Sequence, residues 1–236
     1  MPYYSYYYDP TYLLVLIGVV LSLLASAKVK STFNKYSSVR NARGITGAEA
    51  ARQVLNGAGI YDVTIEHVSG NLTDHYDPKS KVLRLSDSVY GQTSVAAVGV
   101  AAHECGHAIQ HAKGYAPLKL RSTLVPAANI GAKIAWPLIL VGLLINSQSS
   151  WWIIQAGIIA FSLAVLFQIV TLPVEFNASG RAIRILEDTG MMYGDEIKAA
   201  RKVLSAAALT YVASAASSIL QLLRLILLVG GRRRND

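Results

Sequence analysis

The chain has 236 residues, of which 53% are hydrophobic and only 15% charged, and its formal net charge is +8. Soluble domains are about 25% charged, so this composition excludes an ordinary soluble protein and favours a membrane protein. The basic residues lie beside apolar segments and accompany no nucleic-acid-binding motif. We therefore interpret the positive charge as a sign of membrane topology, with the lipid bilayer and not a nucleic acid as its partner.

Four apolar segments are predicted along the chain, at residues 12–27, 125–145, 151–170 and 204–229. A helix needs about 20 apolar residues to cross a hydrocarbon core about 30 Å thick, so the last two segments qualify most readily. The second qualifies only if it begins near Val125, which places Lys133 inside it. The fourth is either a span or a re-entrant helix, because a span would carry the basic tail 230–236 across the membrane.

The first segment is predicted to be an uncleaved anchor. Residues 25–27 resemble a signal-peptide cleavage site, but residues 1–11 contain no Lys or Arg, and basic residues follow the apolar run instead. The regions 28–124 and 171–203 hold most of the Lys and Arg and are expected on the cytoplasmic side by the positive-inside rule. The N-terminus and the loop 146–150 are then expected outside.

The region 28–124 is predicted to form a small α+β unit. Thr46 and Glu49 are spaced as a capping box, which predicts a helix from Gly47 to about Asn56. Strands are then predicted at residues 63–68 and 82–86, with a turn-rich stretch at 71–81 between them. Together they suggest a hairpin or small sheet. A buried helix is predicted over residues 94–112.

This last helix carries the motif His103-Glu104-Cys105-Gly106-His107. Residues four apart share one face of a helix, so His103 and His107 can bind one metal ion while Glu104 stands beside them. Such a site suits hydrolysis, because zinc activates a water and the glutamate acts as general base. Histidines in an apolar helix are costly unless they bind a metal or form hydrogen bonds, which favours this interpretation over two surface histidines.

Catalytic zinc normally takes three protein ligands. The best candidate for the third is Glu175, an acidic residue at the end of the third apolar segment, within 171–203 and on the same predicted side of the membrane. His111 continues the four-residue spacing and is expected at the surface or behind a ligand. Cys105 is expected to be a small buried residue, and Gly106 to let another helix approach closely.

Asp74, His75 and Asp77 form another polar cluster, for which a turn is favoured over a second metal site.

At these residues the sequence resembles the YugP-type neutral zinc metallopeptidases, a family of bacterial membrane proteins. The resemblance covers nearly the whole chain and is carried by residues 70–78, 82–86, 101–111 and 172–179. It implies Zn²⁺, peptidase chemistry and a gluzincin-like core, with His103 and His107 as ligands, Glu104 as base and Glu175 as third ligand.

Related membrane gluzincins carry an Asp four residues after the third ligand, where this chain has Ser179. Either Asn177 or Ser179 is expected to supply the missing hydrogen bond. In such folds the substrate backbone adds to an edge strand above the zinc helix, and 82–86 is the candidate. Its Arg84 either contacts substrate or is a solvated edge charge.

The sequence thus predicts a mainly α membrane protein in which about four apolar helices accompany a zincin-like unit, all in one domain, 1–236. The leading hypothesis is a multi-pass metalloendopeptidase of the bacterial cell membrane that cleaves membrane or membrane-proximal proteins at the cytoplasmic face. One alternative is an intramembrane protease, with the zinc helix inside the bilayer. The other is a non-catalytic zinc-containing scaffold.

Overall fold

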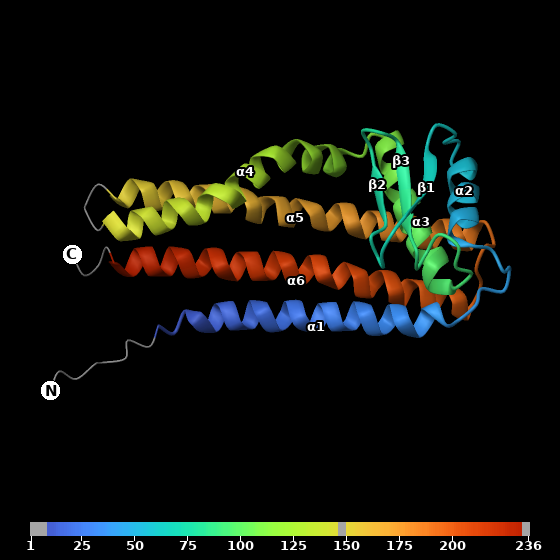
Figure 1. The fold of residues 1–236 in the computed structure, drawn as a ribbon, viewed down its shortest axis with the longest axis horizontal. Helices are drawn as coiled ribbons and strands as arrows, with labels where there is room; N and C mark the ends of the chain where they lie inside the picture. The colour runs from blue at the N-terminus through green and yellow to red at the C-terminus, as the bar shows by residue number, and fades with distance from the viewer. Residues whose placement is uncertain (1–8, 146–149, 233–236) are drawn as a thin grey trace. The chain divides into compact units, whose positions relative to one another are not determined.

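The computed structural model describes residues 9–145 and 150–232 (Figure 1). Within them it has the following elements: α1 Tyr12–Ser37, α2 Gly47–Gly57, β1 Thr64–Val68, β2 His75–Asp77, β3 Val82–Ser86, α3 Val95–Ala112, α4 Ala116–Ile145, α5 Ser150–Asp188 and α6 Asp195–Arg232. The predicted fold class, mainly α with a small α+β part, is confirmed. The N-terminal residues 1–8, most of the loop 146–150 and the tail residues 233–236, which the topology prediction used, lie outside the described residues.

The chain divides into two compact units. One comprises residues 1–24, 123–169 and 212–236, and the other comprises residues 25–122 and 170–211. Helices α1, α4, α5 and α6 each contribute residues to both units. The first unit therefore contains most of the apolar sequence, and the second contains the sheet and the zinc motif.

Four helices, α1, α4, α5 and α6, are long and apolar enough to cross a membrane. Only 11% to 28% of the residues in the most apolar window of each helix are buried, so most of their apolar side chains face outward. Outward-facing apolar side chains are what a lipid environment requires. Helix α6 runs without interruption across the last apolar segment.

Small residues bring the helices of the first unit together. Helices α4 and α5 approach so closely that a Cβ added to Gly157 would lie 2.7 Å from Ile139 Cγ1. Helices α1 and α6 meet where the hydroxyl oxygens of Ser22 and Ser217 lie 3.0 Å apart, and these oxygens lie 2.9 Å and 2.8 Å from the carbonyl oxygen of Gly18, so two hydroxyl hydrogens serve three contacts. Close approach and interhelical hydrogen bonds are the usual means by which helices associate in lipid.

The second unit contains a three-stranded sheet with the order β1-β3-β2, in which β3 pairs parallel to β1 and antiparallel to β2. The expectation that residues 82–86 form an edge strand is therefore wrong. Both edges of β3 are occupied, and the second partner, β2, lies inside the stretch predicted to be only a turn. Four of the five residues of β3 are buried, whereas β1 is mostly exposed.

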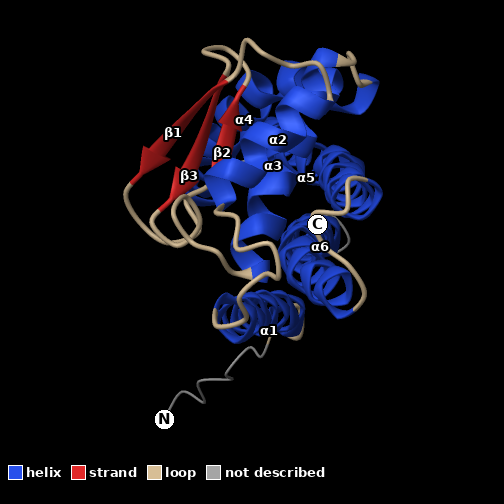
Figure 2. Cartoon of the chain, turned by 90° about the vertical axis from the view of Figure 1, so that its right-hand side faces the viewer, coloured by secondary structure: helices blue, strands red, loops and turns tan. Residues whose placement is uncertain are grey.

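Helices α2 and α3 pack beside the sheet in the same unit (Figure 2). The capping box of α2 is confirmed, because Glu49 N–H donates to Thr46 Oγ1 at 3.2 Å and Thr46 N–H donates to the Glu49 carboxylate at 2.7 Å. Ser94 caps α3 by accepting from Ala97 N–H at 3.1 Å. The apolar residues of α3 are buried in the core of this unit, and the helix packs against β2 and β3.

Gly106 is the point at which α3 meets α5. A Cβ added there would lie 2.7 Å from the carbonyl oxygen of Ala178. That oxygen belongs to helical backbone and cannot move aside as a flexible side chain would. The close approach expected at Gly106 is thus confirmed, and α5 is the helix that uses it.

We predict that Gly106→Ala destabilises the protein by about 1–3 kcal/mol, the usual effect of overpacking a tight contact. Gly99→Ala is the matched control in the same helix, because its Cβ would meet Ala200 Cβ at an ordinary 3.5 Å. Thermal unfolding in detergent measures both. Equal midpoints for the two variants would contradict the proposed helix contact, since alanine otherwise favours a helix over glycine.

Candidate metal centre

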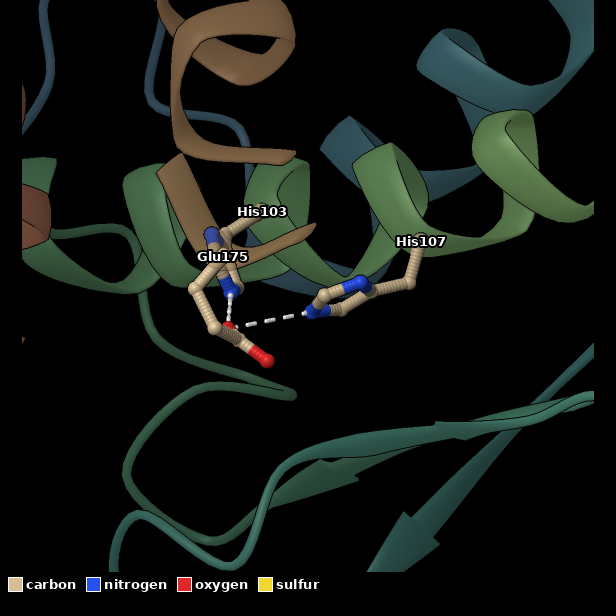
Figure 3. Close-up of side chains that lie close together, drawn as sticks. All are labelled: His103, His107 and Glu175. Carbon is tan, nitrogen blue, oxygen red and sulfur yellow. Dashed lines mark ion pairs between the residues drawn. The ribbon is translucent and has the colours of Figure 1, made fainter. Parts of the chain in front are cut away.

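Three potential metal ligands converge between α3 and α5. The four-residue spacing directs His103 and His107 off the same face of α3, and Glu175 reaches them from α5 (Figure 3). Glu175 Oε2 lies 3.4 Å from His103 Nε2 and 3.5 Å from His107 Nε2. One ligand atom from each of the three residues lies within 4.8 Å of the others.

This geometry fits a metal ion better than it fits direct hydrogen bonds. Two ligands bound at about 2.0–2.1 Å to a tetrahedral zinc ion lie roughly 3.3–3.4 Å apart, close to both distances from Glu175 Oε2. That oxygen is buried in a side chain that is only 3% exposed, and it has no hydrogen-bond partner. A buried carboxylate oxygen without a partner is costly, and a cation held between the three groups would satisfy it.

Neighbouring charged groups shift the pKa of His107. Burial lowers the pKa of its imidazole, but the neighbouring carboxylates Glu175 and Glu104 outweigh this effect and hold the pKa above its ordinary value. The same negative potential that favours a proton on His107 favours a divalent cation. Glu104 is itself buried, at 8% exposure, and follows His103 on the same helix.

Each histidine is held from behind through its other ring nitrogen. Ser179 Oγ lies 3.0 Å from His103 Nδ1, and Gln110 Oε1 lies 3.1 Å from His107 Nδ1. Such contacts orient ligand imidazoles and raise their basicity. Of the two residues expected to supply a missing hydrogen bond, Ser179 contacts a ligand histidine directly, whereas Asn177 contacts Gln110 at 3.0 Å.

The sequence analysis missed two residues beside the cluster. Gln110 is fully buried and donates a hydrogen bond to α5. The sequence could have indicated its importance, because it is the one amide side chain in this apolar helix and lies one turn after His107. Arg121, at the start of α4, places Nη1 3.8 Å from Glu175 Oε1. The two oxygens of Glu175 therefore face different partners, one the histidines and the other a guanidinium.

The remaining candidates lie away from the three ligands. His111 is exposed, and its Nδ1 lies 2.9 Å from the hydroxyl of Tyr76 on β2. Arg84 pairs with Glu66 at 3.2 Å and with Asp77 at 3.8 Å. These contacts make Arg84 part of the charged surface of the sheet.

Cys105 is fully buried, with its Sγ 3.6 Å from the carbonyl of Ala51, and burial raises the pKa of its thiol. It is the small buried residue that was expected.

The polar cluster of Asp74, His75 and Asp77 does not form only the expected turn, because His75–Asp77 is strand β2. The two carboxylates accept hydrogen bonds from nearby residues. Asp74 accepts hydrogen bonds from Ser86 N–H at 2.7 Å and Ser86 Oγ at 2.9 Å. Asp77 accepts from Lys79 N–H at 2.9 Å and from Ser80 Oγ at 2.7 Å. Across residues 9–145 and 150–232, the only group of three His, Cys, Asp or Glu side chains placed to hold a metal is the one formed with Glu175.

Comparison with known proteins gives two matches. A family described as "Putative neutral zinc metallopeptidase" matches residues 11–230. A protein of Bacillus subtilis (strain 168) described as "Putative membrane protease YugP" is 48% identical over 223 residues, which cover 94% of this chain and 98% of that protein. No solved structure matches the chain. The family implies Zn²⁺, and the cluster on α3 and α5 can bind it.

We predict that Glu175→Ala lowers the zinc content of the purified protein well below the one ion per chain expected of the wild type. The loss follows because two imidazoles alone leave a catalytic zinc without its usual third protein ligand. Glu187→Ala, an exposed position on the same helix, is the control and should keep its zinc. Mass spectrometry on detergent-purified proteins measures the stoichiometry, and full zinc occupancy in Glu175→Ala would rule out Glu175 as a ligand.

Proposed function

We propose, since the chain belongs to the neutral zinc metallopeptidase family, that it is a membrane-bound endopeptidase acting on membrane or membrane-proximal proteins. A protease role, a zinc cofactor and a membrane location follow from that membership and from the four long apolar helices. The observation that carries the finer proposal is the buried trio of His103, His107 and Glu175, with Glu104 beside it on the same helix.

The roles of the residues follow from their positions. His103, His107 and Glu175 would hold the zinc ion and leave one coordination position for water. Bound zinc supplies a water of lowered pKa and polarises the scissile carbonyl. Glu104 then accepts the proton of the attacking water and delivers it to the leaving amine. This arrangement, with a glutamate third ligand, is that of a gluzincin.

A peptide substrate is proposed to pair with β2. An extended peptide adds most readily to a strand with one open edge, and β1 and β2 are the edge strands of this sheet. Of these two, β2 is the strand that packs against α3, the helix carrying the histidines. Tyr76 of β2 also contacts His111, one turn beyond His107. Residues 82–86, the earlier candidate, have no open edge.

The site is proposed to lie on the cytoplasmic side of a four-span protein. The regions 28–124 and 171–203 hold most of the Lys and Arg and also all three ligands, which supports one functional domain over 1–236. The intramembrane alternative loses support, because α3 is not among the described helices that qualify as spans. A cysteine introduced at position 75 tests this placement. If a membrane-impermeant reagent labels it only in permeabilised cells, the cytoplasmic side is supported; labelling in intact cells would refute it.

We predict that Glu104→Gln reduces peptide hydrolysis by at least about 100-fold, the usual contribution of a general base, while zinc remains bound. The amide keeps the shape of the side chain but accepts no proton. Glu187→Gln serves as the control and should retain activity. Turnover of a membrane-protein substrate and zinc content are measured together. Undiminished cleavage by the variant would exclude Glu104 as the base, and loss of zinc would show a structural role.

In the inactive Glu104→Gln variant, we predict that a photo-crosslinking residue at His75 captures bound peptide, because that residue lies on β2. The same residue placed at Glu66, on the opposite edge strand β1, should capture none. Mass spectrometry of the crosslinked product gives the result. Capture from Glu66 and not from His75 would place the substrate on the other edge of the sheet.

A further inference from the structure

A chain of hydrogen bonds runs from Arg181 to His107, and the chemistry of its members fixes the direction of each bond. Arg181 Nε–H is a donor only, and it donates to Asn177 Oδ1 at 2.7 Å. Asn177 therefore presents its oxygen, not its amino group, to this neighbourhood. Gln110 Nε2 lies 3.0 Å from the same oxygen and must donate to it.

A second contact gives the same orientation for Gln110. Its Nε2 lies 2.8 Å from the backbone carbonyl of Val174, which can only accept. The reversed amide would place an oxygen against two other oxygens. Both hydrogens of the amide are thus committed to α5, and Gln110 Oε1 is the atom left facing His107.

This orientation determines the tautomer of His107. Gln110 Oε1 accepts only, so His107 Nδ1, at 3.1 Å, must carry the hydrogen and donate it. In the neutral imidazole the lone pair then lies on Nε2, the atom that faces Glu175 Oε2. The residues that Gln110 binds on α5, Val174 and Asn177, stand on either side of Glu175 in the sequence.

We propose that Gln110 is a positioning residue that sets His107 as an Nε2 metal ligand and holds the ligand helix α3 in register with Glu175 on α5. This inference rests on the proposed function, because the positioning serves the zinc site. Gln110 is fully buried and forms hydrogen bonds with His107, Val174 and Asn177, so it acts through His107 and through the backbone before Glu175.

The test is the tautomer of His107 in the metal-free protein, read from ¹⁵N chemical shifts of histidine-labelled protein in detergent. The chain has five histidines, so single substitutions can assign each signal. The pH is raised until the ¹⁵N shifts of His107 no longer change, so that its neutral form is observed. Wild-type His107 should carry its hydrogen on Nδ1. A hydrogen found on Nε2 would overturn the proposal without any variant.

Two variants separate the two parts of the proposal. Gln110→Met keeps the volume and removes every hydrogen bond, so His107 should become a mixture of tautomers and the zinc dissociation constant should rise about 10- to 100-fold. Gln110→Glu keeps an acceptor toward His107 but loses both donors toward α5. It should retain the Nδ1–H tautomer while still binding zinc more weakly than wild type.

Gln53→Met, at an exposed position on α2, is the matched control and should change neither quantity. Zinc affinity is measured by competition with a chromophoric chelator. Wild-type tautomer and affinity in Gln110→Met would overturn the proposal. If that variant does not fold, loss of the Nδ1–H tautomer in Gln110→Glu would overturn it, and retention would support it.

These readouts use no substrate, which separates the inference from the proposed function. A wild type that binds zinc but cleaves nothing would end the peptidase proposal and leave the role of Gln110 standing. A wild type that binds no zinc would also end the peptidase proposal. The tautomer measurement would then still test whether Gln110 orients His107.

Discussion

The backbone contact between α3 and α5 at Gly106 and Ala178 is the constraint on which the candidate site depends. Two of the proposed ligands lie on α3 on either side of Gly106, and the third lies on α5 three residues before Ala178. A side chain at Gly106 would clash with the backbone of α5 at Ala178, so the close approach of the two helices could not be kept unchanged. The site is therefore specified as much by an absent side chain as by the residues that would bind the metal.

The same contact creates an electrostatic cost. It buries the Glu175 carboxylate in an apolar helix, where an uncompensated charge is strongly unfavourable. Arg121 faces one carboxylate oxygen, and the two imidazoles face the other at distances too long for strong hydrogen bonds. A metal ion in this position would complete the compensation, and the protein thereby couples its local stability to its cofactor.

Sequence reasoning went furthest where local periodicity carries the information. The face shared by His103 and His107 follows from helix geometry alone, and Glu175 was chosen because an acidic residue at the end of an apolar segment, on the same predicted side of the membrane, lacks a packing role. The pairing of β3 was not predictable in this way. Its second neighbour, β2, has only three residues and lies in a turn-rich stretch, so the sequence shows no alternation of apolar and polar residues that would predict a strand there. Gln110 was overlooked because its partners on α5 are more than 60 residues away.

The distance along the chain between the ligands also affects how the protein is made. His103 and His107 emerge during synthesis long before Glu175, which follows two apolar segments later on the chain. A nascent chain that ends before α5 holds only two of the three proposed ligands and lacks the backbone that receives Gln110. If Glu175 is the third ligand, the proposed site can be completed only after the third apolar helix has been synthesised.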